Sequence, residues 1–139
     1  MTTEDELYRK AGEILIQACD SLRAKTRQVG SFTRAECLEA LAWELHRQDA
    51  LFERNRHFTR YLTDGFQKSA VADFTLNENV VVVVTCVTRL AGYHFEHLLR
   101  VMHAAQQPVG YLINAGEPES PQLYRRFLGQ YASISVKDH

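Results

Sequence analysis

The chain has 139 residues, of which 45% are hydrophobic and 24% charged, and its net charge is −1 at pH 7. This length suits one domain with a substantial core and excludes two ordinary domains, and the composition excludes a disordered chain. The near-neutral charge excludes a strong overall attraction to nucleic acid, but it is compatible with a local basic face. We expect one domain over residues 1–139, with its core at about 10–128 and a frayed tail at 129–139.

The N-terminal residues are acidic and lack an apolar stretch, so no signal peptide is expected. No apolar run approaches the length of a membrane span. The chain has three cysteines, Cys19, Cys37 and Cys86, which form no CxxC pair and lie in apolar contexts. Reduced, buried thiols of this kind are typical of a cytoplasmic protein.

Two amphipathic helices are predicted first, over residues 3–28 and 33–48. Each carries apolar side chains at helical spacing on one face. Each also begins with a capping-box pattern, Thr-x-x-Glu, at Thr3 and at Thr33. In such a box the threonine side chain and the glutamate side chain bond to each other's backbone amides, which favours a helix start.

Three strands follow as an antiparallel meander, over residues 51–62, 66–76 and 80–87. The first alternates weakly between polar and apolar residues and is expected to be half-exposed, and Asp64-Gly65 predicts the turn after it. The third contains five consecutive valines, Val80–Val84. Because β-branched residues disfavour helices, this run indicates a strand buried on both faces at the centre of a sheet.

Helical spacing returns over residues 92–106, and a short apolar strand is predicted at 109–114. A strand that follows a helix is expected to lie parallel to the valine strand, through a right-handed crossover. Residues 123–128 fit either a last edge strand or a short helix. This order of elements predicts an α/β fold in which a mixed sheet is flanked by helices.

Three short motifs stand at defined places in this order: Ala-Leu-x-x-Glu-Leu at 40–45, Ala-Asp-Phe at 72–74 and Gly-x-Leu-Ile-Asn-x-Gly at 110–116. Together with the element order, they resemble the GxxExxY protein family of the PD-(D/E)XK nuclease-like superfamily, over residues 10–128. The resemblance implies a restriction-endonuclease-like αβββαβ core with an extra N-terminal helix.

In that superfamily an aspartate and the glutamate of a Glu-x-Lys strand bind a divalent metal, and the lysine orients the attacking water. The resemblance places the aspartate at Asp73 and the Glu-x-Lys residues at Val83 and Thr85. It places the family's GxxExxY glutamate at Arg34 and a helix glutamine at His97. Only Asp73 is retained, and one carboxylate on an apolar sheet is a poor magnesium site. We therefore expect a pseudo-nuclease without a cofactor, in which Asp73 is a vestigial metal ligand. The alternative is a strand residue that is hydrogen-bonded to a neighbouring amide or to Arg34, and an ion pair with Arg34 would neutralise its charge.

Two other interpretations remain open. The first is nucleic-acid binding without cleavage, through a strand face that interleaves basic and aromatic residues; its basic residues are Arg54, Arg56, Arg60 and Lys68. A solvated edge protected by charges is the alternative there. The second is an enzyme with a relocated transition-metal site, formed by His94, His97 and Cys86. The alternative there is that the histidines are surface or helix-capping residues.

The leading interpretation is a scaffold or protein-interaction module, which self-associates or binds a protein partner in the cytoplasm and uses neither a membrane nor a cofactor. Such contacts favour exposed aromatic side chains. The expected contact residues are Trp43 and Tyr61, together with Tyr124 and Phe127 on a C-terminal segment that extends from Tyr124 to Tyr131.

Overall fold

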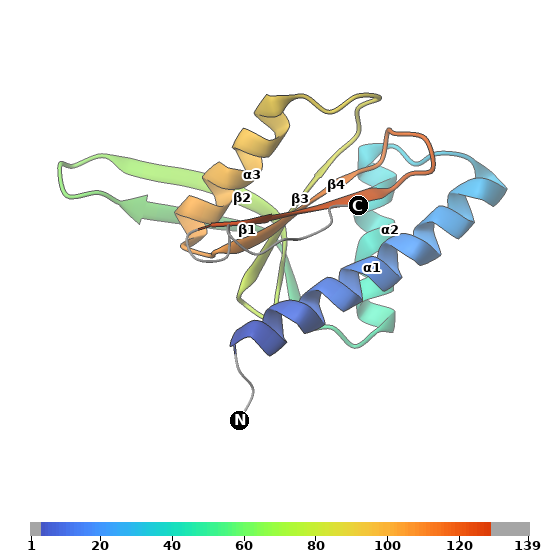
Figure 1. The fold of residues 1–139 in the computed structure, drawn as a ribbon, viewed down its shortest axis with the longest axis horizontal. Helices are drawn as coiled ribbons and strands as arrows, with labels where there is room; N and C mark the ends of the chain where they lie inside the picture. Colours follow the sequence, from blue (N-terminus) through green and yellow to red (C-terminus); the bar gives the residue numbers. More distant parts are fainter. Residues whose placement is uncertain (1–3, 129–139) are drawn as a thin grey trace.

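The computed structural model describes residues 4–128, which form a five-stranded mixed sheet flanked by helices (Figure 1). The strands lie in the order β1-β2-β3-β4-β5, and all neighbours are antiparallel except β3 and β4, which are parallel. None of the helices described has the length and apolar character needed to cross a membrane. In chain order the elements are α1 (Glu4–Val29), α2 (Arg34–Arg47), β1 (Phe52–Tyr61), β2 (Gln67–Leu76), β3 (Val80–Thr85), α3 (Gly92–Ala105), β4 (Val109–Asn114) and β5 (Gln122–Phe127).

The predicted elements are confirmed in type and order, and the C-terminal segment is a strand rather than a helix. This strand, β5, pairs antiparallel with β4 at one edge of the sheet. The predicted capping box of α2 is present: the Thr33 hydroxyl accepts from the Glu36 amide at 3.1 Å, and Glu36 Oε1 accepts from the Thr33 amide at 2.8 Å. The cap predicted at Thr3 lies outside the described residues, as do the predicted tail at 129–139 and Tyr131.

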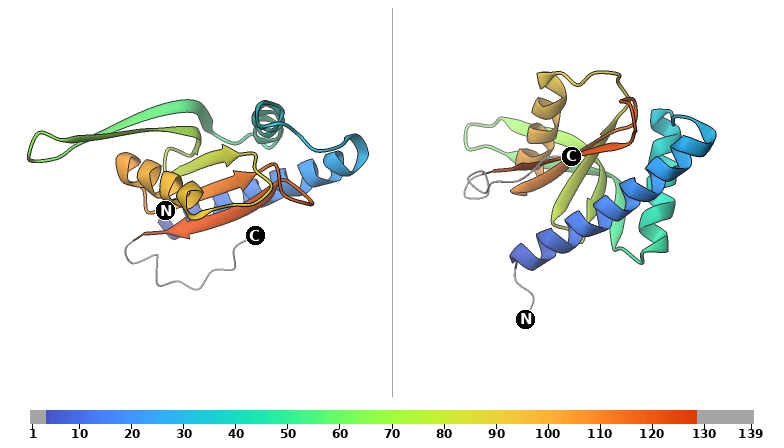
Figure 2. Two further views of the ribbon diagram at one scale, coloured as in Figure 1. Left: turned by 90° about the horizontal axis from the view of Figure 1, so that it is seen from above. Right: turned by 45° about the vertical axis from the view of Figure 1, so that its right-hand side comes forward.

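The valine strand β3 lies at the centre of the sheet and is buried on both faces, as predicted. Val80, Val82 and Val84 pack with α1 and α2, whereas Val81 and Val83 pack with α3. Each of the five side chains is at most 5% exposed. Figure 2 shows α1 and α2 on one side of the sheet and α3 on the other. The continuous apolar run follows from this arrangement, because each face of the strand meets a helical layer.

The sheet forks between β2 and β3. These strands pair only from Phe74 to Leu76, and the earlier part of β2 turns away from β3. Phe74 packs on the α1–α2 side of the sheet, but Ala72, two residues before it, packs on the α3 side. On β1, Asn55 has a left-handed φ of 52°. It lies opposite Asp73, and these two residues interrupt the pairing between β1 and β2, which is continuous on either side of them. The twist at this point directs the rest of the hairpin over α3.

The outer part of the β1–β2 hairpin, residues 57–71, projects from the body as an arm (Figure 1). Phe58 and Ala70 pack the base of the arm against the α3 side of the core. Residues 61–69, which include the predicted turn, are exposed throughout. The arm therefore extends the sheet beyond the part that the core supports.

Asn114, at the end of β4, ties that strand to the chain that leaves β3. Its Oδ1 accepts from the amides of Val87 and Gly116, at 3.0 and 3.1 Å, and its Nδ2 donates to the Val87 carbonyl at 2.9 Å. The side chain is fully buried. A Cβ at Gly116 would lie 2.6 Å from the Val87 amide nitrogen, so only glycine allows this close approach. These contacts explain the Asn-x-Gly part of the motif at 110–116.

Glu44 is a buried carboxylate between α1 and α2, in the Ala-Leu-x-x-Glu-Leu motif. Its side chain is 1% exposed and accepts hydrogen bonds from Ser21, Lys25 and Arg47, at 2.7 to 3.1 Å. Burial alone would raise the pKa of this carboxyl, but the bonds from Arg47, Ser21 and Lys25 outweigh burial and leave the pKa below its ordinary value. Ionised Glu44 therefore holds the two helices together.

Replacing Glu44 with glutamine is expected to lower the free energy of unfolding by about 2 kcal/mol at neutral pH, since hydrogen bonds to charged groups contribute about that much. Because the pKa is lowered in the folded state, this stabilisation is present above the ordinary carboxyl pKa of 4.5 and is lost as the pH falls through the folded-state pKa. Urea unfolding at several pH values measures the difference, with Glu39→Gln, an exposed carboxylate on the same helix, as control. A Glu44→Gln difference that does not shrink in acid would contradict the assignment.

Candidate functional site

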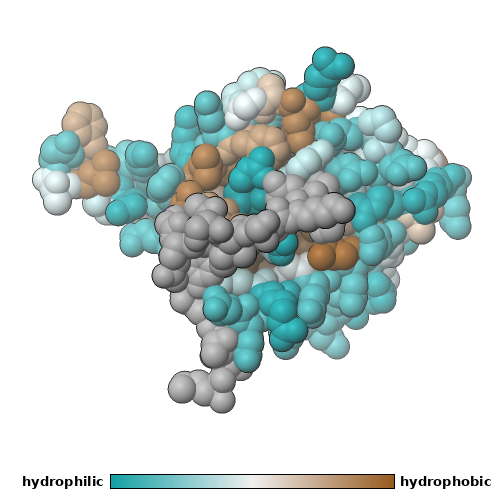
Figure 3. Space-filling view, viewed as in Figure 1, coloured by the Kyte–Doolittle hydropathy of each residue, from teal (hydrophilic) through white to brown (hydrophobic). Residues whose placement is uncertain are grey.

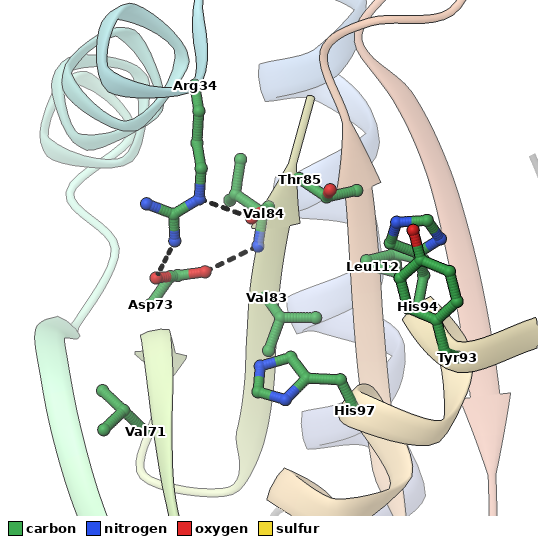
Figure 4. Close-up of a pocket in the computed structure, with 10 residues that line it drawn as sticks. All are labelled: Arg34, Val71, Asp73, Val83, Val84, Thr85, Tyr93, His94, His97 and Leu112. Carbon is green, nitrogen blue, oxygen red and sulfur yellow. Dashed lines mark hydrogen bonds and ion pairs between the residues drawn. The ribbon is translucent and has the colours of Figure 1, made fainter. Parts of the chain in front are cut away.

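At the fork, the side chains of Asp73 and Arg34 form the hydrogen bonds that β3 would otherwise make with β2. Because β2 has left β3, the backbone of Val84 has no strand partner on that side. Asp73 Oδ2 accepts from the Val84 amide at 2.7 Å, and Arg34 Nε donates to the Val84 carbonyl at 2.9 Å (Figure 4). Arg34 Nη2 donates to Asp73 Oδ1 at 2.6 Å. The predicted Arg34–Asp73 ion pair is therefore present, and it also satisfies the backbone that the fork exposes.

The start of α2 positions Arg34. It is the first residue of that helix, directly after the Thr33 cap, so the helix start directs its side chain across the sheet. Its side chain is 49% exposed, whereas that of Asp73 is only 13% exposed. A carboxylate this well shielded from water requires a partner for its charge, and the guanidinium supplies one.

A pocket of about 510 Å³ opens beside the ion pair, between the fork and the start of α3 (Figure 4). The five positions that the resemblance assigned to the nuclease site all line this pocket. They are Arg34, Asp73, Val83, Thr85 and His97; the other lining residues are Val71, Val84, Tyr93, His94 and Leu112. The alignment of Glu-x-Lys with Val83 and Thr85 is therefore consistent with the geometry.

The residues of this pocket do not fit a divalent metal. Magnesium requires several oxygen ligands, usually including more than one carboxylate or phosphate. Within residues 4–128, Asp73 is the only carboxylate that lines the pocket, and each of its oxygens already accepts a hydrogen bond. Val83 has no ligand atom, and Thr85 offers only a neutral hydroxyl. The guanidinium of Arg34 also places a positive charge where a cation would have to approach, and this charge repels a metal ion.

The predicted histidine–cysteine metal site does not form. His94 Nδ1 accepts from the Ala91 amide at 2.9 Å, so this residue caps the start of α3. The Cys86 thiol lies 3.7 Å from the Phe32 carbonyl, and Phe32 packs on the α1–α2 side of the sheet, opposite α3. Within residues 4–128, no three His, Cys, Asp or Glu side chains are grouped so that they could hold a metal ion. His94 and His97 both line the pocket, but Cys86 does not.

The expectation that all three thiols are buried is wrong for one of them. Cys19 and Cys37 are fully buried, and burial raises the pKa of each thiol to about 12, so neither is a nucleophile near neutral pH. Cys86 is exposed, because β3 ends just before it.

The predicted basic face is divided by the twist in β1. Arg54 pairs with Glu39 of α2 at 2.9 Å, on one side of the sheet. Arg56 pairs with exposed Glu53 at 3.6 Å and lies over the ring of Phe58, which packs toward α3. Arg56 shares the α3 face of the hairpin with Arg60 and Lys68, which lie directly opposite each other in the arm. The four cations therefore do not form one surface.

The predicted contact residues also separate into two groups. Trp43 is 61% exposed on α2, and Tyr61 is 78% exposed at the end of β1. Tyr124 and Phe127 are instead engaged within the chain. The Tyr124 hydroxyl donates to Glu117 at 2.7 Å, and Phe127 packs against the α1–α2 side of the core. Both side chains are half-buried, and their role as contact residues stays a prediction.

Sequence reasoning missed three lining residues, Val71, Tyr93 and Leu112. Val71 reaches the pocket because β2 twists at the fork, and the sequence carries no clear signal for that twist. Leu112 faces the pocket as the neighbour of Val83 in the parallel pair β3–β4, a register that the predicted crossover does not specify. Tyr93 stands in the first turn of α3, where its exposed ring adds nothing to the apolar pattern.

Comparison with known proteins identifies the fold. The model of the PD-(D/E)XK nuclease superfamily matches residues 24–127. No curated protein matches the chain. The crystal structure of SSO0001 is similar, with a TM-score of 0.49 and 15% sequence identity; the match covers 86% of this chain and 58% of SSO0001, less than two thirds of that protein. With a family match over most of its length and the mixed sheet described above, the chain belongs to the PD-(D/E)XK nuclease superfamily.

Proposed function

We propose that the chain is a nuclease-fold domain that does not cleave nucleic acid and acts by binding another protein. One observation carries the first part of this proposal. The carboxylate that would bind the metal is paired with Arg34, while Val83 and Thr85 stand where a second carboxylate and a lysine would be needed. Phosphodiester hydrolysis in this superfamily depends on those groups, so the pocket lacks the means to activate a water.

Incubating the purified protein with Mg²⁺ or Mn²⁺ and with single- and double-stranded DNA and RNA is expected to give no cleavage above a metal-free control. The Asp73→Asn variant, which keeps the shape of the side chain, is the matched control for a contaminating nuclease. Cleavage by the wild type that disappears in Asp73→Asn would overturn the proposal. Cleavage that is equal in both proteins would come from a contaminant.

The arm supports the second part of the proposal. Tyr61, Leu62 and Phe66 are 78%, 37% and 68% exposed at its end, although the turn there is ordered by a bond from the Leu62 amide to the Phe66 carbonyl at 2.7 Å. Figure 3 shows apolar side chains, in brown, at this projecting end. Exposed aromatic residues on a protruding, ordered hairpin are typical of a surface that a protein partner covers.

A Phe66→Ser variant is expected to weaken partner binding at least tenfold, because it removes most of an apolar anchor. Self-association is the first form of binding to test, by sedimentation velocity over a range of protein concentrations. Trp43→Ser, an exposed aromatic residue on α2, is the matched control. Dimers that persist in Phe66→Ser but not in Trp43→Ser would place the contact on α2 instead.

Nucleic-acid binding without cleavage is the second candidate. Arg60 and Lys68 face each other across the arm next to Tyr61, and basic and aromatic residues together bind single strands. The same nucleic acids as in the cleavage experiment serve as probes, followed by fluorescence anisotropy. Affinity that falls steeply between about 50 and 200 mM salt would support it. If no probe is retained at low salt, this candidate is removed and the protein partner remains.

A further inference from the structure

The lining of the pocket beside the ion pair does not favour a charged ligand. Its floor is formed by the aliphatic side chains of Val71, Val83 and Leu112. Among the residues that the structure describes, Asp73 is the only acidic side chain and Arg34 the only arginine or lysine that lines it, and the two form an ion pair at 2.6 Å. A charged ligand would therefore lose its hydration without gaining a free counter-charge. These features favour an uncharged ligand.

The edge of the pocket carries polar groups with unused hydrogen-bonding capacity. Neither the Thr85 hydroxyl nor the His97 imidazole makes a side-chain hydrogen bond within residues 4–128. Each oxygen of Asp73 accepts one bond from the protein and can accept another. Donors and acceptors are thus available around the apolar floor, from Asp73 on β2, Thr85 on β3 and His97 on α3.

Aromatic rings stand at the opposite side of the mouth. The rings of Tyr93 and His94 lie against each other, with centroids 4.1 Å apart and planes inclined by 34°. Figure 4 shows them across the pocket from Asp73, next to Leu112. His94 is held in place by its bond to the Ala91 amide, and Tyr93 is 65% exposed. A flat ring that enters the pocket would therefore meet an aromatic surface on this side.

We propose that this pocket binds an uncharged, planar heteroaromatic molecule of about the size of a purine nucleoside. The ring lies over Val83 and Leu112 and against Tyr93, while its polar edge bonds to Thr85 and Asp73. The volume of about 510 Å³ and the combination of an apolar floor with a few polar groups are typical of small-molecule sites. The inference rests on the proposed function, because a catalytic metal beside Asp73 would occupy the same polar edge.

Adenosine, guanosine and benzimidazole, with cyclohexanol as the non-aromatic control, are the probes. Saturation-transfer NMR and calorimetric titration follow binding to the full chain in EDTA. At least one heteroaromatic probe is expected to bind, and cyclohexanol is not. Tyr93→Ala, which alters an exposed side chain, should weaken that binding about tenfold, as the loss of one stacking partner does. Thr85→Val should weaken it about fivefold, and Val29→Ala, at an exposed position at the end of α1, should leave it unchanged.

Failure of the inference and failure of the proposed function give different results. If none of the three aromatic probes binds in EDTA or in Mg²⁺, the ligand inference is overturned, while the cleavage experiment is unaffected. The ligand inference is also overturned if the Tyr93→Ala and Thr85→Val variants bind the aromatic probe with the affinity of the wild type. Binding that requires Mg²⁺ or Mn²⁺, by contrast, would show a metal in the pocket and would overturn both proposals.

Discussion

The triple variant Arg34→Gln, Val83→Glu and Thr85→Lys is expected to bind Mn²⁺, and the wild type is expected not to bind it. The substitutions remove the competing guanidinium and restore a second carboxylate and a lysine around Asp73, on side chains that already line one pocket. Two carboxylates in a partly enclosed site suffice for a dissociation constant on the order of 1 mM or lower. Calorimetric titration measures the affinity, and a rise in melting temperature with Mn²⁺ provides an independent readout.

Asp73→Asn in the triple background is the matched control, and it should abolish the binding. The new glutamate replaces a side chain that is only 2% exposed, so the metal-free variant is expected to be less stable than the wild type and to regain stability with Mn²⁺. Circular dichroism establishes that the variant is folded. A folded triple variant that binds no Mn²⁺ would show that these positions do not converge as the nuclease residues do.

Replacing Asn114 with alanine is expected to lower the free energy of unfolding by about 3 kcal/mol. The substitution removes three hydrogen bonds and leaves the amide and carbonyl of Val87 without partners in a partly buried place, which costs about 1–3 kcal/mol for each buried group. This is a large fraction of the stability of an ordinary domain. Urea unfolding followed by circular dichroism measures the change in the midpoint.

Gln122→Ala is the control for that prediction. Gln122 lies directly opposite Asn114 in the β4–β5 pair, and its amide bonds only to loop carbonyls near the surface. Its loss is expected to cost less than about 1 kcal/mol. If both variants lose the same free energy of unfolding, the bonds of Asn114 to Val87 do not stabilise the chain after β3.

Much of the fold could be predicted because local patterns and global packing agree. The five valines predict a central strand, and they are buried by helices on both faces. Thr33 and Glu36 predict the start of α2, and their reciprocal bonds are present. The predicted Arg34–Asp73 pair also follows from a local rule, because a partly buried carboxylate needs a positive partner.

What could not be predicted depends on the fork. An alternating strand is expected to keep one set of side chains on one face, but Ala72 and Phe74 lie on opposite faces. The same twist separates Arg54 from Arg60, so simple alternation does not place all four cations on one face. The left-handed turn at Asn55 is the only local sign of this twist, since asparagine adopts that conformation more readily than most residues.

The bond between the Val84 amide and Asp73 has a consequence for exchange with solvent. An amide in a strand ladder exchanges its hydrogen when the strands separate, which is set by the stability of the sheet. The Val84 amide is instead covered by a side chain whose charge is balanced by Arg34. We expect this amide to exchange its hydrogen with solvent when its bond to Asp73 breaks, even while the strands of the sheet stay paired. One backbone position in the central strand thus reports on a side-chain ion pair and not on the strand that contains it.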